Sequence, residues 1–307
     1  MTFAGHRDNC RMVAGTRRLW GAQSPVAPLR RALVRPPCWS PAQALQEDLG
    51  PWGFTSPPDL AAAGEEHAAL VAILRKAGVQ VHECREPAPA LYDSVFAGDW
   101  ALVTDAGAVV LRPGKPVRTE EADLAERAFA QAGVPVLHRM RGPGTAEGGD
   151  LLWLRPDTLL AGRSYRTSAD GVQELRSVLE PLGVRVLPVP VAHWKGPGSV
   201  MHLLSVISMI DYDLAVVYPP LMAVEAVEML RANGVELIEV DDEEFLTQGC
   251  NILALAPRRC VVMAGNPRVR KQLEKRGVEV HEFPGRELGL NMGGGPTCLV
   301  QAVLRDY

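Results

Sequence analysis

Residues 65–83 read EEHAALVAILRKAGVQVHE, an amphipathic helix that ends at a glycine and runs directly into a short β-branched strand. The same pattern returns at 121–138, 171–189, 222–240 and 266–283. Within each copy the apolar residues recur at i, i+3, i+4 and i+7 spacing, so one face of each helix is expected to pack on a sheet. A helix commonly closes on a glycine in the left-handed conformation, and the five copies close at Gly78, Gly133, Gly183, Gly234 and Gly277.

A short strand or a hairpin precedes each of these helices, at 31–37, 100–113, 150–163, 213–220 and 251–265. Three of these segments read as hairpins, with turns at 105–107, 155–157 and 257–259. The unit is therefore strand, strand, helix, strand, and the glycine spacing makes it about 45–55 residues long. Five such units fill the chain and predict one repeat-built α/β domain. The alternative is an ordinary open α/β sheet whose helices are similar by coincidence.

The composition is that of an ordinary globular protein, with 307 residues, 47% hydrophobic and 22% charged. The net charge is −4 and no basic stripe stands out, so nucleic acid is not expected as a partner. No apolar run approaches the roughly 18 residues of a membrane span, so no membrane partner is expected either. Residues 1–27 carry scattered arginines without an apolar core. They predict a loosely ordered N-terminal tail before a single domain at 28–307.

The six cysteines form no CxxC pair and show no regular spacing; they are Cys10, Cys38, Cys84, Cys250, Cys260 and Cys298. This pattern argues against structural zinc and against a disulfide framework. Free thiols fit a cytoplasmic protein.

Four polar or glycine-rich stretches stand out between the expected elements: YDSVFAGD (92–99), AEGGD (146–150), MHLLSVISMID (201–211) and LNMGGGPTC (290–298). Each adjoins a strand of a different unit, and loops at one end of a repeat array converge on a shared site. Taken singly, each has a structural explanation. The carboxylates suit turns, His202 suits a core position, and Cys298 suits a glycine-rich loop with an incidental thiol.

Together these stretches supply a thiol, an imidazole and several carboxylates, which can act as nucleophile, general acid/base and ligands for a cation. A guanidinium is planar and cationic, and it donates paired hydrogen bonds to carboxylates. Because its charge is delocalised, its carbon is a poor electrophile that suits attack by a clamped thiolate. Cysteine proteases need an oxyanion hole and one orienting group instead. If LVQAVL at 299–304 begins a helix, its N-terminus would lower the pKa of the Cys298 thiol.

The order Phe-x-x-Asp (96–99), Glu-Gly-Gly-Asp (147–150), His-Leu (202–203) and a glycine-rich Cys near the C-terminus resembles the guanidino-group-modifying enzymes. Arginine deiminase, agmatine deiminase, glycine amidinotransferase and dimethylarginine dimethylaminohydrolase belong to this group. The resemblance covers roughly residues 28–305 and implies the pentein fold, a five-bladed pseudo-symmetric α/β propeller of ββαβ units. The segments at 31–37, 92–104, 109–118 and 166–175 most resemble the dimethylarginine dimethylaminohydrolases.

By this resemblance Cys298 is the nucleophile, His202 is the acid/base, and Glu147 is the third catalytic residue. Asp99 and Glu147 would hold the guanidinium, and two arginines would bind the substrate's α-carboxylate. The substrate-binding residues that the resemblance implies are Asp99, Asp93, Arg118, Arg166 and Leu33.

Two positions depart from the pattern of the group. Deiminases and amidinotransferases have an Asp two residues after the histidine, whereas this chain has Leu204 there. The dimethylargininase branch also lacks this Asp but usually has Lys, so Leu204 is expected to form an apolar pocket wall. Gly98 stands where many members of the branch carry Glu.

The resemblance implies a hydrolase of linear amidines that cleaves a C–N bond of arginine or of an N-methylated arginine. It would work through a covalent thiouronium on Cys298, without metal or organic cofactor, and release citrulline or a related ureido product. Transfer of the amidino group to an amine, deimination of arginine and a non-enzymatic role like that of the ribosome anti-association factors stay open as alternatives. The last group lacks the Cys/His pair. The sequence leaves the oligomeric state, including a homodimer, undecided.

Overall fold

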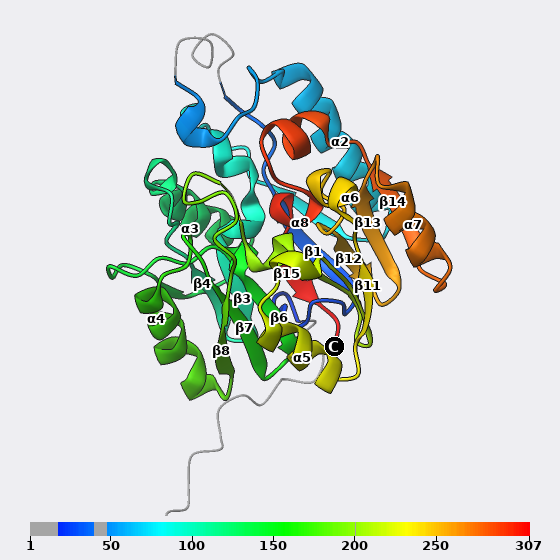
Figure 1. The fold of residues 1–307 in the computed structure, drawn as a ribbon. Helices are drawn as coiled ribbons and strands as arrows, with labels where there is room; N and C mark the ends of the chain where they lie inside the picture. Colours follow the sequence, from blue (N-terminus) through cyan, green and yellow to red (C-terminus); the bar gives the residue numbers. More distant parts are fainter. Residues whose placement is uncertain (1–17, 40–47, 200) are drawn as a thin grey trace, which may run out of the picture.

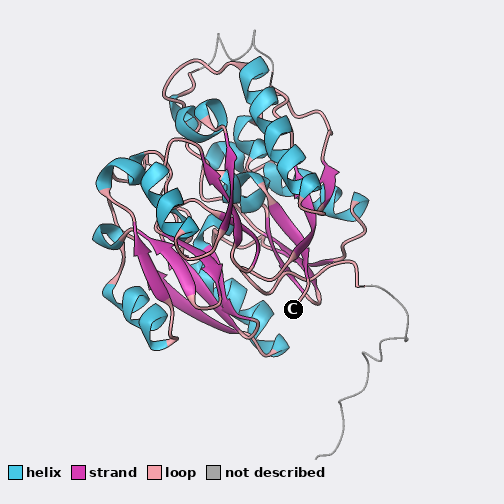
Figure 2. Ribbon diagram, turned by 90° about the vertical axis from the view of Figure 1, so that its right-hand side faces the viewer, coloured by secondary structure: helices cyan, strands magenta, loops and turns pink. Residues whose placement is uncertain are grey.

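The computed structural model describes residues 18–39, 48–199 and 201–307, and arranges them as five three-stranded sheets. The sheets surround the middle of the molecule, and most helices lie on the outside (Figures 1 and 2). In order along each sheet, the strands are β15 (Gln301–Arg305), β1 (Leu29–Val34) and β2 (Gln80–Glu83); β3 (Ala101–Thr104), β4 (Gly107–Val110) and β5 (Val136–Arg139); β6 (Leu151–Arg155), β7 (Thr158–Arg163) and β8 (Arg185–Pro190); β9 (Ile207–Asp211), β10 (Leu214–Val217) and β11 (Glu236–Glu239); and β12 (Leu253–Ala256), β13 (Arg259–Met263) and β14 (Glu279–Phe283).

Every sheet repeats one connection pattern, in which the middle strand is antiparallel to the first strand and parallel to the third. A helix links the middle strand to the third, because parallel neighbours need a crossover. These helices are α2 (Leu60–Lys76), α3 (Glu121–Gln131), α4 (Ala169–Leu179), α5 (Val224–Ala232) and α7 (Pro267–Glu274). The five glycines predicted to close them have φ between 70° and 85°. The ββαβ propeller predicted from the repeat is therefore confirmed.

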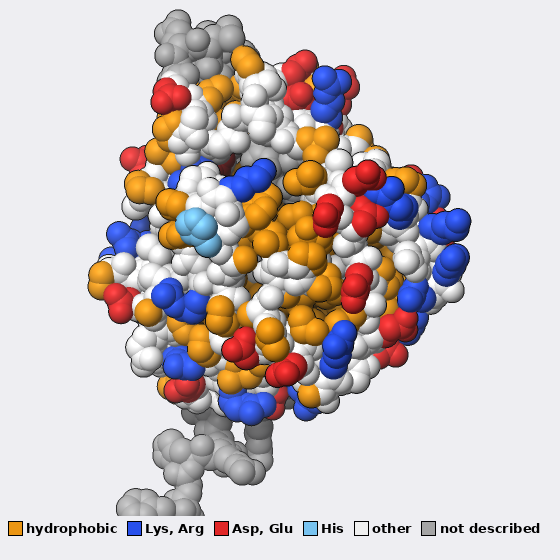
Figure 3. All heavy atoms as spheres, in the orientation of Figure 1, with side chains coloured by type: hydrophobic (Ala, Val, Ile, Leu, Met, Phe, Trp, Pro, Cys, Tyr) orange, Lys and Arg blue, Asp and Glu red, His pale blue; other side chains and the backbone are white. Residues whose placement is uncertain are grey.

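The middle strands are buried on both faces, as the all-buried strands β4 and β10 show. In β4, Ala108 and Val110 belong to the core cluster that includes α3, and Val109 belongs to the cluster that includes β6, β7 and α4 of the next unit. Burial on both faces explains why these strands read as apolar runs without alternation. On the face seen in Figure 3, hydrophobic side chains gather near the middle, and cationic and anionic side chains are interspersed around them. Among the described residues, no helix combines the length and apolarity needed to cross a membrane.

Two strands were missed by the sequence interpretation. β9 lies within a stretch assigned to a loop and forms a fourth hairpin with β10, turning at Tyr212. The run LVQAVL is not a helix start, because most of it forms β15, which pairs antiparallel with β1 through Leu33 and Gln301. The first sheet is thus completed by the last strand of the chain, and this closes the ring.

Residues 18–27, which the sequence interpretation assigned to the tail, lie against this closure. Gly21 donates its N–H to the Val303 carbonyl at 2.9 Å and accepts from the Arg305 N–H at 2.9 Å. Three apolar side chains of this segment are buried, namely Ala22, Val26 and Ala27, whereas Leu19 is exposed. Residues 1–17 lie outside the described residues, so the division into tail and single domain stays a prediction.

Candidate active site

The turns that carry the candidate residues each come directly before the first strand of a sheet. Asp93 and Asp99 lie in two turns before β3, at Tyr92–Val95 and Ala97–Asp99. Glu147 begins the turn before β6, His202 the turn before β9, and Cys298 lies in α8 (Pro296–Leu299) before β15. Equivalent positions in a ring of repeats lie at the same end of the ring. The structure therefore brings stretches from four units to one place.

Glu147 is the centre of the polar network at this end of the ring, and it is fully buried. Its Oε2 lies 2.8 Å from Nε2 of His202, and its Oε1 accepts from the Gly114 N–H at 3.0 Å and from Arg166 Nη1 at 3.2 Å. Burial alone would raise the pKa of Glu147, but the His202 hydrogen bond and the charges of Arg118 and Arg166 hold this pKa well below its usual range. Glu147 is therefore a carboxylate at neutral pH.

Asp99 joins the same network through both of its oxygens. Oδ1 accepts from the Gly149 N–H at 2.9 Å, and Oδ2 accepts from Arg118 Nη1 at 2.9 Å. Arg118 also donates from Nε and Nη2 to Glu121, at 3.0 and 2.9 Å. Burial alone would lower the pKa of Arg118, but Glu121, Asp99 and Glu147 raise it well above the ordinary value. Its charge is therefore compensated inside the protein, and the contact with the substrate's α-carboxylate that the resemblance implies for Arg118 stays a prediction.

The imidazole of His202 is held by the neighbouring turn. A Cβ added to Gly149 would lie 2.4 Å from its Nδ1, so only glycine leaves the ring room there. Asp150 fixes the backbone just after the histidine, because its Oδ1 accepts from the Leu203 N–H at 2.9 Å. Its Oδ2 accepts from the Ser164 hydroxyl at 2.5 Å. Asp150, the second acidic residue of the Glu-Gly-Gly-Asp motif, thus holds the backbone of the loop that carries His202.

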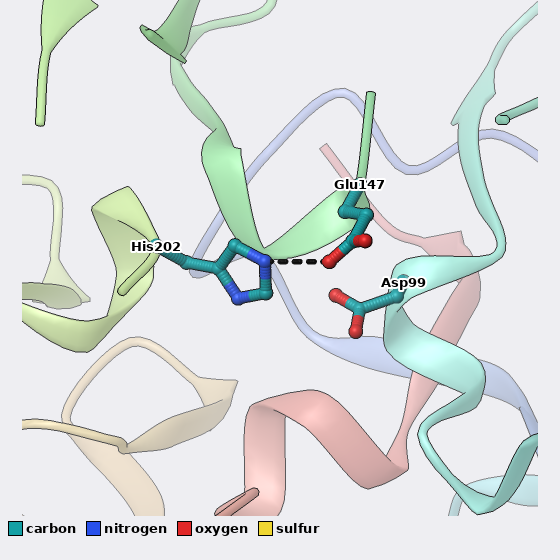
Figure 4. Close-up of side chains that lie close together, drawn as sticks. All are labelled: Asp99, Glu147 and His202. Atoms are coloured by element: carbon teal, nitrogen blue, oxygen red, sulfur yellow. Dashed lines mark hydrogen bonds and ion pairs between the residues drawn. The ribbon is translucent and has the colours of Figure 1, made fainter. Parts of the chain in front are cut away.

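His202 is surrounded by carboxylates, and Figure 4 shows it facing Glu147 and Asp99. Burial alone would lower the pKa of His202, but the charges of Asp150 and Asp99 and the hydrogen bond to Glu147 raise it to about 9. At neutral pH the ring is therefore an imidazolium that can donate a proton.

Cys298 is presented by a turn in which two glycines make room for neighbours. A Cβ on Gly294 would lie 2.2 Å from the ring of Phe96, and a Cβ on Gly295 would lie 2.4 Å from the side chain of Asn251. Burial, and then the charge of Asp99, raise the pKa of the thiol to about 11. The expected lowering by a following helix does not occur, because the chain after α8 continues as a strand.

A small cavity lies between these side chains and contains the sulfur, the imidazole and two of the carboxylates. Its walls are Trp52, Asp93, Phe96, Asp99, Arg118, Arg166, His202, Met292, Gly293, Gly294 and Cys298. Asp93 is paired with Lys115, whose Nζ donates to Oδ2 at 2.6 Å, and its Oδ1 has no hydrogen-bond partner among the described residues. One carboxylate oxygen of a residue that lines the cavity is therefore unsatisfied.

Besides the fully buried Glu147, three positions singled out from the sequence do not line this cavity. Leu33 is 1% exposed and packs in the core against residues such as Ala97 and Trp100, so the substrate contact expected of it does not fit. Gly98 and Leu204 line a separate cavity of about 140 Å³ that the first strands of all five sheets enclose. Leu204 was expected to form an apolar wall of the substrate pocket. It lines the axial cavity instead, and it does not line the cavity that contains the thiol.

The sequence interpretation gave no role to four residues that complete the site: Glu121, Asp150, Lys115 and Asn251. The first three compensate or orient the residues described above. Asn251 donates from Nδ2 to the Cys298 sulfur at 3.3 Å. A signal was available for Asn251, since it lies two residues before the first strand of the fifth sheet, as Asp99 lies two residues before β3.

Asp99, Glu147 and His202 each present a ligand atom within 4.8 Å of the others, a spacing compatible with a metal ion. Arg118 and Arg166 already donate to these carboxylates. A further cation would meet two guanidinium groups, so the set fits a metal poorly.

A family model described as N,N-dimethylarginine dimethylhydrolase, eukaryotic, matches residues 58–305. The chain belongs to this family. An N(G),N(G)-dimethylarginine dimethylaminohydrolase of Streptomyces coelicolor is 32% identical over 277 residues, which cover 89% of this chain and 96% of that relative. An arginine deiminase of Rhodococcus opacus is 32% identical over 231 residues, which cover 62% of this chain and 55% of the deiminase.

The fold is also found among solved structures. A family member from Pseudomonas aeruginosa, a mutant complexed with citrulline, superposes with a TM-score of 0.74 at 25% identity and covers 90% of this chain and 100% of its own. The resemblance stated from the sequence and the pentein propeller are both confirmed.

Proposed function

We propose that this chain is a hydrolase that cleaves a C–N bond in the guanidino group of arginine or of an N-methylated arginine, giving citrulline and an amine. One observation carries the proposal. The thiol of Cys298, the imidazolium of His202 and the carboxylate of Asp99 line one cavity, with Glu147 hydrogen-bonded to the imidazolium. Family membership supports the same chemistry.

Substrate binding would activate the nucleophile. The Cys298 thiol is protonated at neutral pH, because burial and Asp99 raise its pKa. A guanidinium next to the sulfur adds an opposite charge, which favours the thiolate. The thiol therefore releases its proton to solvent when the cationic substrate binds, and Asp99, a wall of the cavity, offers acceptors to the guanidinium N–H groups.

The bond changes then follow in two stages. The Cys298 sulfur forms a bond to the guanidino carbon, and the C–N bond to the departing amine breaks as His202 supplies its proton. The remaining carbon is a thiouronium on Cys298. Neutral His202 next takes one proton from water as the water oxygen bonds to the carbon. The C–S bond then breaks and the sulfur leaves as thiolate, while the remaining proton of the added hydroxyl passes to solvent to give the neutral ureido product.

Two further residues that line the cavity suit an amino-acid head group. Arg166 donates from Nη1 to Glu147, and no hydrogen bond from its Nη2 joins it to the described residues, so it has donors left for a carboxylate. The unpartnered Oδ1 of Asp93 can accept from an α-ammonium group. Both groups line the cavity that holds Cys298.

Deimination of arginine is a second candidate, and the likeness to the arginine deiminase of Rhodococcus opacus favours it. The bond changes are the same, with ammonia leaving in place of methylamine or dimethylamine. Because Leu204 faces the axial cavity, the missing Asp after His202 does not by itself choose between these leaving groups.

The deciding experiment is a substrate screen with identification of both products. Arginine, monomethylarginine, asymmetric dimethylarginine and agmatine are each incubated with the protein, ureido product is measured colorimetrically, and the amine is identified by mass spectrometry. We expect citrulline with methylamine or dimethylamine. Ammonia from arginine as the main product would establish the deiminase, and an amidino group on added glycine would establish a transferase.

Two cysteine variants serve as controls for this screen. Cys298→Ser should abolish turnover and leave the circular dichroism spectrum unchanged. Cys38→Ser replaces a thiol that is also partly exposed but lies outside the cavity, and it should retain activity. Full activity of Cys298→Ser would refute the proposed chemistry.

A further inference from the structure

Asn251 contacts the nucleophilic sulfur with an amide whose orientation is fixed. Its Oδ1 accepts from the Thr297 N–H at 3.0 Å and from the Thr297 hydroxyl at 2.6 Å. The backbone N–H can only donate, so this end of the amide must be the oxygen. The NH₂ end therefore faces Cys298, where Nδ2 lies 3.3 Å from the sulfur.

The backbone on either side of Asn251 is anchored to the neighbouring sheet. Ser208 in β9 donates its hydroxyl to the Cys250 carbonyl at 2.6 Å and accepts from the Ile252 N–H at 3.1 Å. The chain enters this position through Gln248, which has a φ of 66° that non-glycine residues rarely adopt. A strained turn held from both sides places the amide with little freedom.

The close packing of Gly295 against Asn251 also indicates that the amide is held next to the sulfur. A Cβ on Gly295 would lie 2.4 Å from Cγ of Asn251, so the glycine before α8 is what lets the amide reach the sulfur. Asn251 is 4% exposed, and its amide is therefore used inside the protein. In the ring, Asn251 occupies in the fifth unit the place that Asp99, Glu147, His202 and Cys298 occupy in the other four.

We propose that Asn251 is a positioning residue that holds the Cys298 sulfur and stabilises its thiolate by donating a hydrogen bond from Nδ2. The inference rests on the proposed role of Cys298 as nucleophile. An N–H donor to sulfur favours the charged form, because the thiolate is the better acceptor. The bond supports the attack on the guanidino carbon, and it supports the release step in which the sulfur leaves as thiolate.

The test measures the thiolate directly and not through turnover. Cys298 is alkylated with iodoacetamide between pH 7 and 10, and labelling of its peptide is followed by mass spectrometry, separately from the other cysteines. In Asn251→Ala we expect the rate at a given pH to fall about tenfold, which corresponds to a rise of about one unit in the thiol pKa. Asn251→Asp keeps the acceptor for Thr297 but places negative charge at the sulfur, so it should react more slowly still.

Asn266→Ala is the matched control. Asn266 is an equally buried amide of the same unit, and its Nδ2 donates to the Thr247 and Met263 carbonyls at 3.0 Å each. Its replacement should lower stability without changing the pH dependence of Cys298 labelling. A labelling profile of Asn251→Ala and Asn251→Asp that coincides with that of the wild type would overturn the proposal.

A measurement on the wild type covers the case in which both Asn251 variants fail to fold. With selectively ¹⁵N-labelled asparagine, the Asn251 side-chain amide signals should titrate together with the thiolate absorbance near 240 nm, and Cys298→Ser should abolish that titration. Amide signals that do not follow the thiolate would also overturn the proposal. Failure of the proposed function is distinguishable, because a wild type inactive on every guanidino compound can still show this dependence on Asn251.

Discussion

The charge on His202 links the stability of the fold to pH at the scale of a single residue. Asp150 and Asp99 and the hydrogen bond to Glu147 raise its folded-state pKa from an ordinary 6.5 to about 9. A raised pKa gives stability that is fully present below about 6.5 and is lost as the pH rises through about 9. We expect the unfolding free energy of the wild type to fall over this range, relative to that of His202→Asn, by no more than a few kcal/mol. Thermal denaturation of both proteins across this pH range measures the difference. A pH-independent difference between the two proteins would contradict the assigned charge.

Substitutions of the two arginines at the cavity should differ in their effects on substrates with and without an α-carboxylate. Arg118 is enclosed by Glu121 and Asp99, whereas Arg166 keeps free donors. We expect Arg166→Lys to raise KM for the preferred arginine substrate about tenfold or more and to leave the weaker reaction with agmatine little changed. Arg118→Lys should lower kcat for both compounds together. Equal loss on both compounds in the Arg166 variant would remove that residue from carboxylate binding.

The side chains that sequence could single out were those with conspicuous chemistry. Cys298 follows a glycine run, and His202 stands in an apolar stretch, so each is unusual where it is. Glu121 begins a helix, where acidic residues are common, and Asn251 is a neutral amide at the start of an expected hairpin. Their roles depend on contacts with Arg118 and the Cys298 sulfur, which only the folded chain defines.

At the scale of elements, two neighbouring glycines in the turn that carries Cys298 are required for different reasons. Gly294 is needed because a Cβ would meet the ring of Phe96, whereas Gly293 has open space but a φ of 86°. Gly294→Ala should displace α8 and lower kcat on the order of 100-fold, since small shifts of a nucleophile are costly. Gly293→Ala should cost about 1 kcal/mol of stability from backbone strain. Steady-state kinetics and thermal denaturation separate the two effects.

Gly277→Ala is the control for the strain alone, because Gly277 has a φ of 74° and open space at a helix end remote from the site. It should match Gly293→Ala in stability and the wild type in kcat. If Gly294→Ala also kept the wild-type kcat, the close fit against Phe96 would not govern the nucleophile.

The elements that sequence predicted well are those defined by local signals. The five crossover helices combine a 3.6-residue apolar period with a closing glycine, and both features are visible in a short window. β9 lacks such a signal, because four of its five residues are buried and no alternation marks it. β15 was misassigned for a different reason, since the run LVQAVL becomes a strand only by pairing with β1, about 270 positions earlier in the chain.

At the scale of the whole molecule, the ring is closed by the pairing of β15 with β1, and Arg305 stabilises this closure. Its guanidinium is buried and donates to the Ala27 carbonyl at 2.6 Å and to the Ala254 carbonyl at 2.9 Å. It therefore ties the last strand to the N-terminal segment and to β12 of the fifth sheet. No carboxylate of the described residues lies within ion-pair distance of Arg305, so these carbonyls are its polar partners.

We expect Arg305→Met to keep the apolar bulk and leave both carbonyls without their donor, which should lower the unfolding free energy by about 3 kcal/mol. Arg30→Met is the control, because Arg30 is a neighbour in the closing sheet whose exposed ion pair with Asp306 should contribute about 0.5 kcal/mol or less. Urea denaturation measures both. Since Cys298 lies three residues before β15, loosening the closure should also reduce kcat in Arg305→Met at temperatures well below its unfolding midpoint. Unchanged kcat with the expected loss of stability would mean that α8 is held by its local contacts and not by the ring.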